Sequence, residues 1–295
     1  MTLRDGSLDS GAGAPSSTTS SGTLHVGISG WRYAPWRGDF YPKGLPQRRE
    51  LEYAAQQLTS IEINGSFYSL QRPSSYARWR SEVPEDFVFA VKGGRFVTHM
   101  KRLRDVEAPL ANFFASGVLA LDNTLGPILW QLPATFAYDE AVVRNFFALL
   151  PRTTTEAAQL ATQHDDKVSG DKLWSGEVAE RPIRYALEPR HQSFASDEAL
   201  AALTECDVAL VVADSAGKWP RFEQAVGPIV YARLHGDTEL YASGYTDSAL
   251  EQWADRLCGW TDDGREAFVY FDNDMKGYAP HDARKLIAKL EERAT

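Results

Sequence analysis

The chain has 295 residues, of which 43% are hydrophobic, and carries a formal net charge of −9 at pH 7. This length and hydrophobic content suit a globular α/β protein with a large core and argue against a disordered chain. The negative charge argues against a broad nucleic-acid-binding surface, which needs clustered cations, and no apolar run approaches the roughly 20 residues that span a bilayer.

Residues 1–22 consist mainly of Ser, Gly, Thr and Ala, and they are predicted to form a disordered tail. The remaining residues, 23–295, are predicted to form a single domain. The N-terminus lacks the charged-then-apolar order of a signal peptide. The two cysteines, Cys206 and Cys258, form no Cys-x-x-Cys pair of the metal or redox type. A cytoplasmic location is therefore expected.

Eight short apolar segments follow in chain order, and each is predicted to be a β-strand. They cover residues 24–29, 60–64, 87–92, 127–133, 184–190, 208–214, 231–236 and 268–273. Helices are predicted at residues 47–58, 74–80, 108–116, 139–150, 196–205, 247–259 and 281–292, and the polar residues 162–182 are predicted to be a surface insertion. Regular strand–helix alternation implies a parallel sheet, and eight units in this length fit a TIM-barrel-like (β/α)8 domain. A doubly wound open sheet is the alternative fold, but the glycines after the first strand lack the spacing that it needs.

Most of these strands end in polar side chains on the face that would point into a barrel. Side chains alternate across a strand, so Tyr231, Arg233 and His235 share one face. The polar residues expected at the ends of the other strands are Glu62, Asn64, Lys92, Glu188, Arg190, Asp214 and Asn273. Because the C-terminal ends of barrel strands surround one opening, these groups are expected to form a single polar pocket.

A series of short motifs runs through the chain. They are Gly27-x-Ser29-Gly30-Trp31, Glu62-x-Asn64-x-x-Phe67-Tyr68, Val91-Lys92 with Thr98-His99, Gln131-Leu132-Pro133, Glu188-x-Arg190-x-x-Ser193, Arg233-x-His235-Gly236 with Tyr241 and Tyr245, and Asn273-Asp274-x-x-Gly277. Together they resemble the motifs of the YecE-like family, a widespread group of uncharacterised proteins, over about residues 24–292. The resemblance implies a TIM-barrel-like fold and no established reaction. The chain departs from the family pattern at Gly65-Ser66, where Ser-Thr is expected, and at Asp272, where Asn is expected.

Arg233 and His235 allow two interpretations. They could close the barrel mouth by pairing with Glu188 and Asp214. Alternatively, Arg233, Arg190 and Lys92 converge on an anion, since guanidinium groups bind carboxylate or phosphate in a bidentate manner and lysine adds a compact charge. Buried ion pairs often stabilise no better than apolar replacements. The sequence therefore favours a ligand site, and Arg233→Ala is expected to abolish binding with little effect on folding.

The leading hypothesis is an enzyme, a hydrolase or a lyase, that acts on a small anionic substrate, with phosphorylated compounds among the candidates. Glu188 and His235 are predicted to move protons, because a barrel site can bring either pKa near neutrality. The predicted substrate-binding residues are Arg190, Arg233, Lys92, Glu62, Asn64, Asn273, Tyr68, His99, Asp214 and Tyr245. The expected partner is a small anionic molecule, whereas extended nucleic-acid binding and membrane association are not expected.

Two other functions stay open. Glu62, Glu188 and Asp214 could hold a divalent metal with His235 or His191, which would suit a metal-dependent phosphodiesterase or a nucleic-acid end-processing enzyme. No short-range ligand motif supports such a metal, so no cofactor is assigned. The other alternative is a non-catalytic barrel that binds a metabolite without converting it.

Aromatic residues gather in two segments. The first is expected to pack as a loop over the first helix, with a stacking platform for a base or sugar as the alternative, and comprises Trp31, Tyr33, Trp36, Phe40 and Tyr41. The second segment, around Tyr241 and Tyr245, is either a mobile lid with polar tips or an ordinary aromatic loop.

Overall fold

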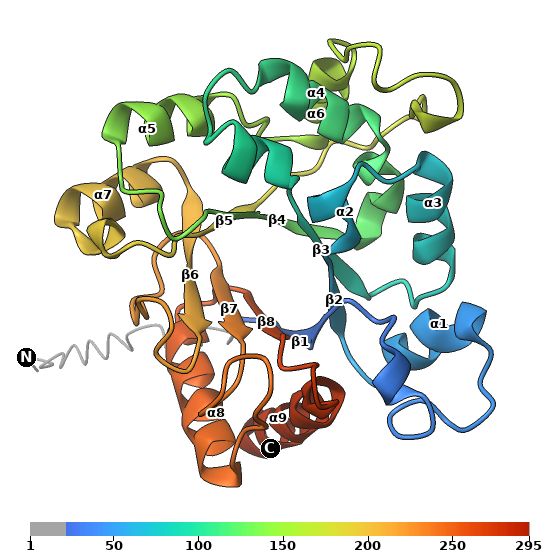
Figure 1. Cartoon of the computed structure of the whole chain (residues 1–295), viewed down its shortest axis with the longest axis vertical. Helices are drawn as coiled ribbons and strands as arrows, with labels where there is room; N and C mark the ends of the chain where they lie inside the picture. Colours follow the sequence, from blue (N-terminus) through green and yellow to red (C-terminus); the bar gives the residue numbers. More distant parts are fainter. Residues whose placement is uncertain (1–21, 295) are drawn as a thin grey trace, which may run out of the picture.

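Eight parallel strands form a closed barrel in a computed structural model, which describes residues 22–294 (Figure 1). Each strand pairs with the next along the chain, and the last pairs with the first. The strands are β1 (Leu24–Ser29), β2 (Ser60–Ile63), β3 (Val88–Lys92), β4 (Leu125–Gln131), β5 (Tyr185–Glu188), β6 (Val208–Asp214), β7 (Val230–Leu234) and β8 (Ala267–Phe271). The predicted (β/α)8 fold is confirmed. The predicted tail, residues 1–22, lies outside the described residues except for Gly22.

Helices surround the barrel on its outer face (Figure 1). They are α1 (Glu50–Ala55), α2 (Gly65–Tyr68), α3 (Pro73–Ser81), α4 (Glu107–Ala115), α5 (Glu140–Ala148), α6 (Thr154–Ala161), α7 (Asp197–Glu205), α8 (Asp247–Thr261) and α9 (Tyr278–Ala294). Within residues 22–294, none of the helices combines the length and the apolar character needed to span a bilayer.

Helix α6 is absent from the sequence-based prediction, although its start carries a clear signal. The Thr153 side chain accepts a hydrogen bond from the Glu156 backbone amide, and the Glu156 carboxylate accepts one from the Thr153 amide. This reciprocal capping box satisfies two amides that would otherwise lack partners at the helix start. The polar segment 162–182 is irregular as predicted, apart from one short turn of 3-10 helix at Gly170–Lys172.

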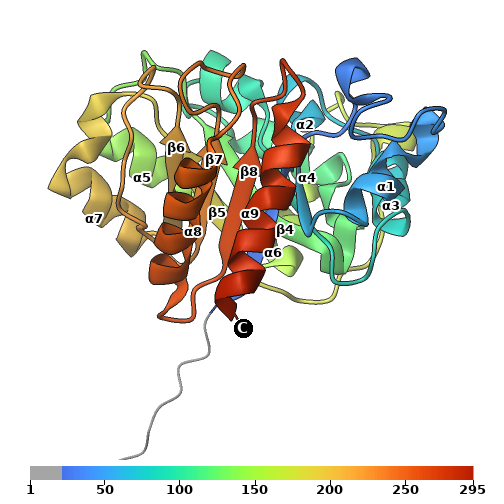
Figure 2. The ribbon, with the colours of Figure 1, turned by 90° about the horizontal axis from the view of Figure 1, so that it is seen from below.

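Alternation along each strand sorts the apolar side chains into two cores. Residues such as Val26 and Ile61 face the helices in the larger, outer core. The barrel interior contains mostly small or aromatic side chains, namely Ala90, Leu129, Ala186, Ala209, Val211, Ala213, Ile229, Tyr231, Phe268 and Tyr270. The arrowheads of β6, β7 and β8 point to one edge of the barrel in Figure 2. We call this edge, formed by the C-terminal ends of the strands, the mouth.

Candidate functional site

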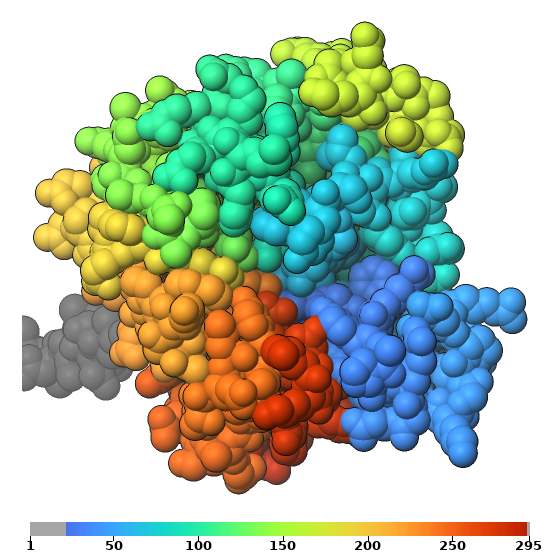
Figure 3. Space-filling view, in the orientation of Figure 1, coloured from blue at the N-terminus to red at the C-terminus, as the bar shows by residue number. Residues whose placement is uncertain are grey.

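Buried charged side chains from five strands or their ends meet at the mouth. They are Glu62 on β2, Lys92 on β3, Glu188 on β5, Arg233 on β7 and the residue after β8, Asp272, whose side chain is 15% exposed. Figure 3 shows the mouth face, where the blue, cyan and orange segments of the chain meet near the middle. Such a concentration of charge is the chemically distinctive feature of the barrel, because fully buried Lys, Glu, Arg and Asp are rare without partners.

Arg233 is fully buried, and its guanidinium contacts carboxylates from three other parts of the barrel. Nη2 and Nε donate hydrogen bonds to Oε1 and Oε2 of Glu62, at 2.8 and 3.1 Å. Nη1 donates to Glu188 Oε2 at 2.8 Å. Nη2 also donates to Asp272 Oδ2 at 2.9 Å and to Ser29 Oγ at 3.2 Å. We call these five residues the mouth network. The prediction that Arg233 binds an anion directly does not fit this placement, because the guanidinium is enclosed by carboxylates.

Glu62 is the most completely satisfied carboxylate of the mouth network. Besides the two bonds from Arg233, its Oε2 accepts a hydrogen bond from the Tyr231 hydroxyl at 2.6 Å, and its Oε1 accepts one from Ser29 Oγ at 2.9 Å. Each oxygen therefore has two donors. Charge-assisted bonds of this number hold a carboxylate in one orientation, so Glu62 supports Arg233.

Glu188 lies between two arginines. Its Oε1 is 2.9 Å from both Nε and Nη2 of Arg190, while its Oε2 accepts the bond from Arg233. The Arg190 guanidinium also stacks on Trp219, with its central carbon 3.5 Å from the ring centroid. Burial alone would raise the pKa of Glu188, but Arg190 and Arg233 hold this pKa well below its usual range. Glu188 is therefore a permanent anion at neutral pH, and the expectation that its pKa lies near neutrality is wrong.

His235 is fully buried beside the mouth network. Its Nδ1 lies 3.0 Å from Asp272 Oδ2 and its Nε2 lies 3.9 Å from Glu188 Oε1, but neither contact has hydrogen-bond geometry. The ring packs edge-on against Tyr241, at 5.3 Å between centroids. Burial would raise the pKa of Asp272, but Arg233 and His235 lower it to about 2. The imidazole of His235 thus lies against the carboxylates of Asp272 and Glu188.

Lys92, the last residue of β3, differs from the other charged groups of the mouth because it has no carboxylate partner. Its ammonium lies over the Phe67 ring, 4.5 Å from the centroid, and among residues 22–294 no carboxylate oxygen lies within 4.0 Å of it. The residue is 8% exposed. Burial and then the positive charge of Arg233 lower the pKa of Lys92 to about 8.

His99 packs on the same aromatic ring as Lys92. Its ring lies edge-on to Phe67, at 5.2 Å between centroids, and its Nδ1 is 2.9 Å from Thr98 Oγ1. Burial and the charge of Lys92 lower the pKa of His99 to about 4, so the imidazole is neutral at pH 7. His99 belongs to a π-helical turn at Phe96–Met100, and Leu103 beyond this turn is buried.

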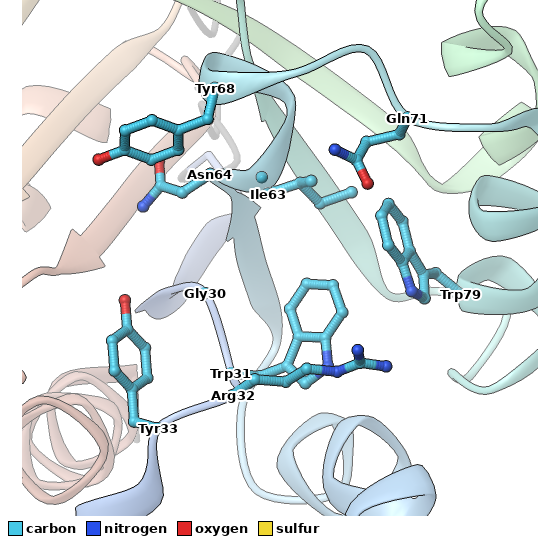
Figure 4. A pocket seen from close by; sticks show the side chains of 10 residues that line it. Gly30, Trp31, Arg32, Tyr33, Ile63, Asn64, Tyr68, Gln71 and Trp79 are labelled. Atoms are coloured by element: carbon cyan, nitrogen blue, oxygen red, sulfur yellow. The ribbon is translucent and has the colours of Figure 1, made fainter.

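A cavity of about 340 Å³ lies beside the mouth, between the segments that follow β1 and β2 (Figure 4). It is lined by Gly30, Trp31, Arg32, Tyr33, Ile63, Asn64, Gly65, Tyr68, Gln71 and Trp79. In Figure 4, the polar ends of Tyr33, Asn64 and Tyr68 lie on one side, and Trp31 and Trp79 lie on the other. The Asn64 amide oxygen is buried without a hydrogen-bond partner in the described part of the chain.

The cavity adjoins the mouth network but does not contain it. Tyr33 connects the two, since its hydroxyl donates to the Ser29 backbone oxygen at 2.7 Å. The predicted site residues Asn64 and Tyr68 therefore belong to the cavity. The expected loop packing is confirmed for the fully or nearly buried members of the first aromatic segment, Trp36, Phe40 and Tyr41, whereas Trp31 and Tyr33 line the cavity.

Asn273 and Tyr245 fix the segment that follows β7. The Asn273 amide donates to the Ser243 carbonyl at 2.9 Å and to Asp282 Oδ2 at 3.0 Å. The Tyr245 backbone amide donates to the same Asp282 oxygen at 3.0 Å, and its hydroxyl accepts a bond from the Gly236 amide at 3.2 Å. The Asn273 side chain and the Tyr245 backbone thus tie residues 236–245 to α9, while the Tyr245 hydroxyl bonds within the segment.

Asp214 is the last residue of β6, but its side chain does not face the barrel interior. Leu210 and Val212 of β6 face the outer core, and Asp214 shares their face because strand side chains alternate. Its Oδ2 lies 3.7 Å from Arg221 Nη1, and burial raises its pKa above the usual value. The sequence predicts the end of β6 correctly, but the last residue of this strand that faces the barrel interior is Ala213 and not Asp214.

The described residues contain no group of three or more His, Cys, Asp or Glu side chains arranged to hold a metal ion. Of the predicted ligands, Glu62 and Glu188 bond to Arg233, and Asp214 faces away from them. A guanidinium thus takes the position between the carboxylates that a bound cation would need.

Sequence comparisons place the chain among proteins that lack an assigned activity. A family model described as "Protein of unknown function DUF72" matches residues 25–295. The UPF0759 protein YecE of Escherichia coli K12 is 28% identical over 113 residues, which cover 38% of this chain and 39% of that protein. The UPF0759 protein YunF of Bacillus subtilis 168 is 26% identical over 121 residues, covering 38% and 41%. Each match thus spans about two-fifths of the relative's length.

Solved structures of two bacterial proteins have the same fold. A DUF72 family protein of Thermotoga maritima MSB8 aligns with a TM-score of 0.71 and 23% identity, covering 91% of this chain and 99% of that one. A DUF72 family protein of Enterococcus faecalis V583 aligns with a TM-score of 0.68 and 17% identity, covering 91% and 96%. At these identities the likeness concerns the fold alone.

Proposed function

The chain belongs to the DUF72 family of proteins of unknown function, and on that premise we propose that it is an enzyme acting on a small anionic compound at the mouth of its barrel. One observation carries the proposal. The ammonium of Lys92 is nearly buried at the mouth without a carboxylate partner, whereas each carboxylate of the mouth network bonds to Arg233. An anion from solution would supply the missing partner, because unpaired buried charge is costly.

Arg190 provides a second cationic contact for the same anion. Its Nε and Nη2 face Glu188, and its side chain is 12% exposed. The stack on Trp219 holds the planar guanidinium in one orientation. Arginine in a fixed orientation binds carboxylate and phosphate groups with well-defined geometry. Lys92 and Arg190 therefore replace Arg233 as the proposed anion-binding residues.

The proposed proton-transfer groups are the two histidines. His99 is neutral at pH 7 and can accept a proton, and the ring nitrogens of His235 lie 3.0 Å from Asp272 Oδ2 and 3.9 Å from Glu188 Oε1. Glu188 supports this chemistry as a fixed negative charge. TIM-barrel enzymes carry their reacting groups at the C-terminal ends of the strands, which supports this location by analogy with the fold.

The neighbouring cavity is proposed to hold the uncharged part of the substrate. Aromatic side chains such as Trp31 and Trp79 provide an apolar wall, while Tyr33, Asn64 and Tyr68 provide hydroxyl and amide groups. A concave site with a few polar groups among apolar ones is typical of small-molecule binding.

The proposal is tested by thermal shift and calorimetry with lactate, pyruvate, glycerol 3-phosphate and AMP, each with and without Mn²⁺. A ligand at about a hundredfold over its Kd stabilises a fold by roughly 2.7 kcal/mol. We expect a stabilising anion whose binding is lost in Lys92→Met, weakened in Arg190→Gln and unchanged in Arg49→Gln. Arg49 is a matched control because it forms an exposed pair with Glu52.

The outcomes separate the alternatives. If none of the anions stabilises the protein, the anion site is wrong. Binding without turnover, followed by NMR of the ligand, would favour a non-catalytic metabolite-binding barrel. Binding or cleavage of AMP only with Mn²⁺ would favour a metal-dependent phosphodiesterase.

A further inference from the structure

We propose that Lys92 is a nucleophile that forms an imine with a small anion carrying an aldehyde or ketone group. The inference rests on the proposed function and deepens it, because it names the substrate class and the bond that forms. Lysine amines act in this way only when they are neutral, and a desolvated position near another cation favours the neutral form.

The surroundings of Lys92 suit an amine better than a permanent ammonium ion. Its Nζ contacts the face of Phe67 and has no carboxylate within 4.0 Å among the described residues. The charges of Glu62, Glu188 and Asp272 favour the ammonium form, but burial and Arg233 outweigh them, and each of these carboxylates bonds to an arginine. Arg233 adds a positive charge that disfavours a second one.

Lys289 provides the contrast within the same chain. Its side chain is 12% exposed, close to the enclosure of Lys92, but its Nζ lies 2.6 Å from Glu251 and 2.9 Å from Asp247. These hydrogen bonds raise the pKa of Lys289, whereas the pKa of Lys92 is lowered to about 8. At pH 7 roughly a tenth of Lys92 would then be neutral, against roughly one in three thousand for an ordinary lysine.

The proposed step is a condensation without oxidation or reduction. The lone pair of Nζ attacks the carbonyl carbon and forms a C–N bond, while the π electrons of the carbonyl move to its oxygen, which takes up a proton. The nitrogen loses a proton to His99, which packs on the same Phe67 ring. His99 returns a proton to the hydroxyl group, which leaves as water as the C=N bond forms. One amine, one carbonyl and the one proton that the oxygen takes from solvent thus give one protonated imine and one water.

Chemical trapping tests the inference. The native chain is incubated separately with glyoxylate and with pyruvate, and sodium cyanoborohydride then reduces any imine to a stable secondary amine that peptide mass mapping locates. We expect at least tenfold more adduct on Lys92 than on Lys289 or on an exposed lysine such as Lys218, with a trapping rate that rises with pH around pH 8. Lactate, which has the carboxylate but no carbonyl, should bind and leave no adduct.

Two variants complete the design. Lys92→Arg keeps a cation and removes the amine, so it should lose the adduct and retain lactate binding, and Lys92→Met should lose both. Thermal unfolding establishes that each variant is folded. Adducts spread over exposed lysines, or none on Lys92, would overturn the imine. If lactate and pyruvate bind equally without trapping, the imine fails while the anion site stands. Trapping on Lys92 without lactate binding would support the amine and reject the anion site.

Discussion

Arg233 on β7 and Glu62 on β2 form a bidentate ion pair across the barrel interior, between strands that are not neighbours in the sheet. Both side chains are fully buried. Since β8 and β1 separate the two strands, the pair ties opposite parts of the barrel wall together just below the mouth. Its role in the site is therefore to position Glu188 and Asp272, which share the same guanidinium.

Arg233→Met should destabilise the protein strongly. Removing the guanidinium leaves three neighbouring carboxylates without their shared partner, and breaking a buried pair in this way costs about 3–5 kcal/mol. Urea unfolding at pH 7 measures the loss. Arg49→Met is the control, because its partner Glu52 is exposed and such pairs contribute less than about 1 kcal/mol. If Arg233→Met lowers the unfolding free energy by less than about 1 kcal/mol, Arg233 does not stabilise the fold and is again a candidate for ligand binding.

The pKa of Lys92 should appear in the pH dependence of stability. It is about 8 in the folded chain, against an ordinary value of 10.5. Between these pH values the unfolded chain binds more protons than the folded one, so stability rises with pH by about 1.4 kcal/mol per unit. Below pH 8, the buried ammonium of Lys92 lowers the unfolding free energy of the wild type by the full amount, about 3 kcal/mol. The difference in unfolding free energy, wild type minus Lys92→Met, should therefore increase from pH 8 to pH 10, and a constant difference would contradict the lowered pKa.

Asn273→Ala should loosen residues 236–245. The substitution removes the bond to the Ser243 carbonyl and one of the two bonds to Asp282 Oδ2, which keeps its bond from the Tyr245 amide, at a cost of about 1–3 kcal/mol. Amide hydrogen exchange should accelerate in this segment before it does in the strands. In the control Asn123→Ala, the lost bond to the Glu85 carbonyl is exposed, and exchange in 236–245 should not change. Equal protection in both variants would mean that Asn273 does not anchor the segment.

Gly27→Ala should prevent normal folding, because β1 approaches β2 too closely for a side chain. A Cβ atom at Gly27 would lie 1.8 Å from the Ser60 carbonyl oxygen, which is backbone and cannot rotate away. We expect a loss above about 3 kcal/mol, measured by circular dichroism and denaturant unfolding. Gly259 in α8 is the matched control, since a Cβ there meets nothing within 4 Å and alanine should stabilise the helix by about 0.5–1 kcal/mol. Similar effects of both substitutions would show that the close approach is unimportant.

Local patterns in the sequence were sufficient to predict the barrel and many of the residues that face its interior. Strands β1 and β6 begin and end at the predicted residues, and Glu62, Lys92 and Arg233 point inward as alternation requires. The capping box at Thr153 would also have revealed α6. No local signal distinguishes Asp214 from the inward residues, because a one-residue shift in phase moves a side chain to the other face.

The sequence by itself determined the eight strands, their common direction and which polar residues lie near the mouth, because these properties follow from periodicities of a few residues. Only the tertiary structure decided which charges meet. Arg233 and Glu62 are 171 positions apart, and the Lys92 ammonium is left without a carboxylate because Arg190 and Arg233 engage those around it. Such pairings depend on the order, register and closure of the strands, which no short stretch of sequence encodes. They decide chemistry because a buried charge acquires its pKa and its reactivity from the groups within a few ångströms.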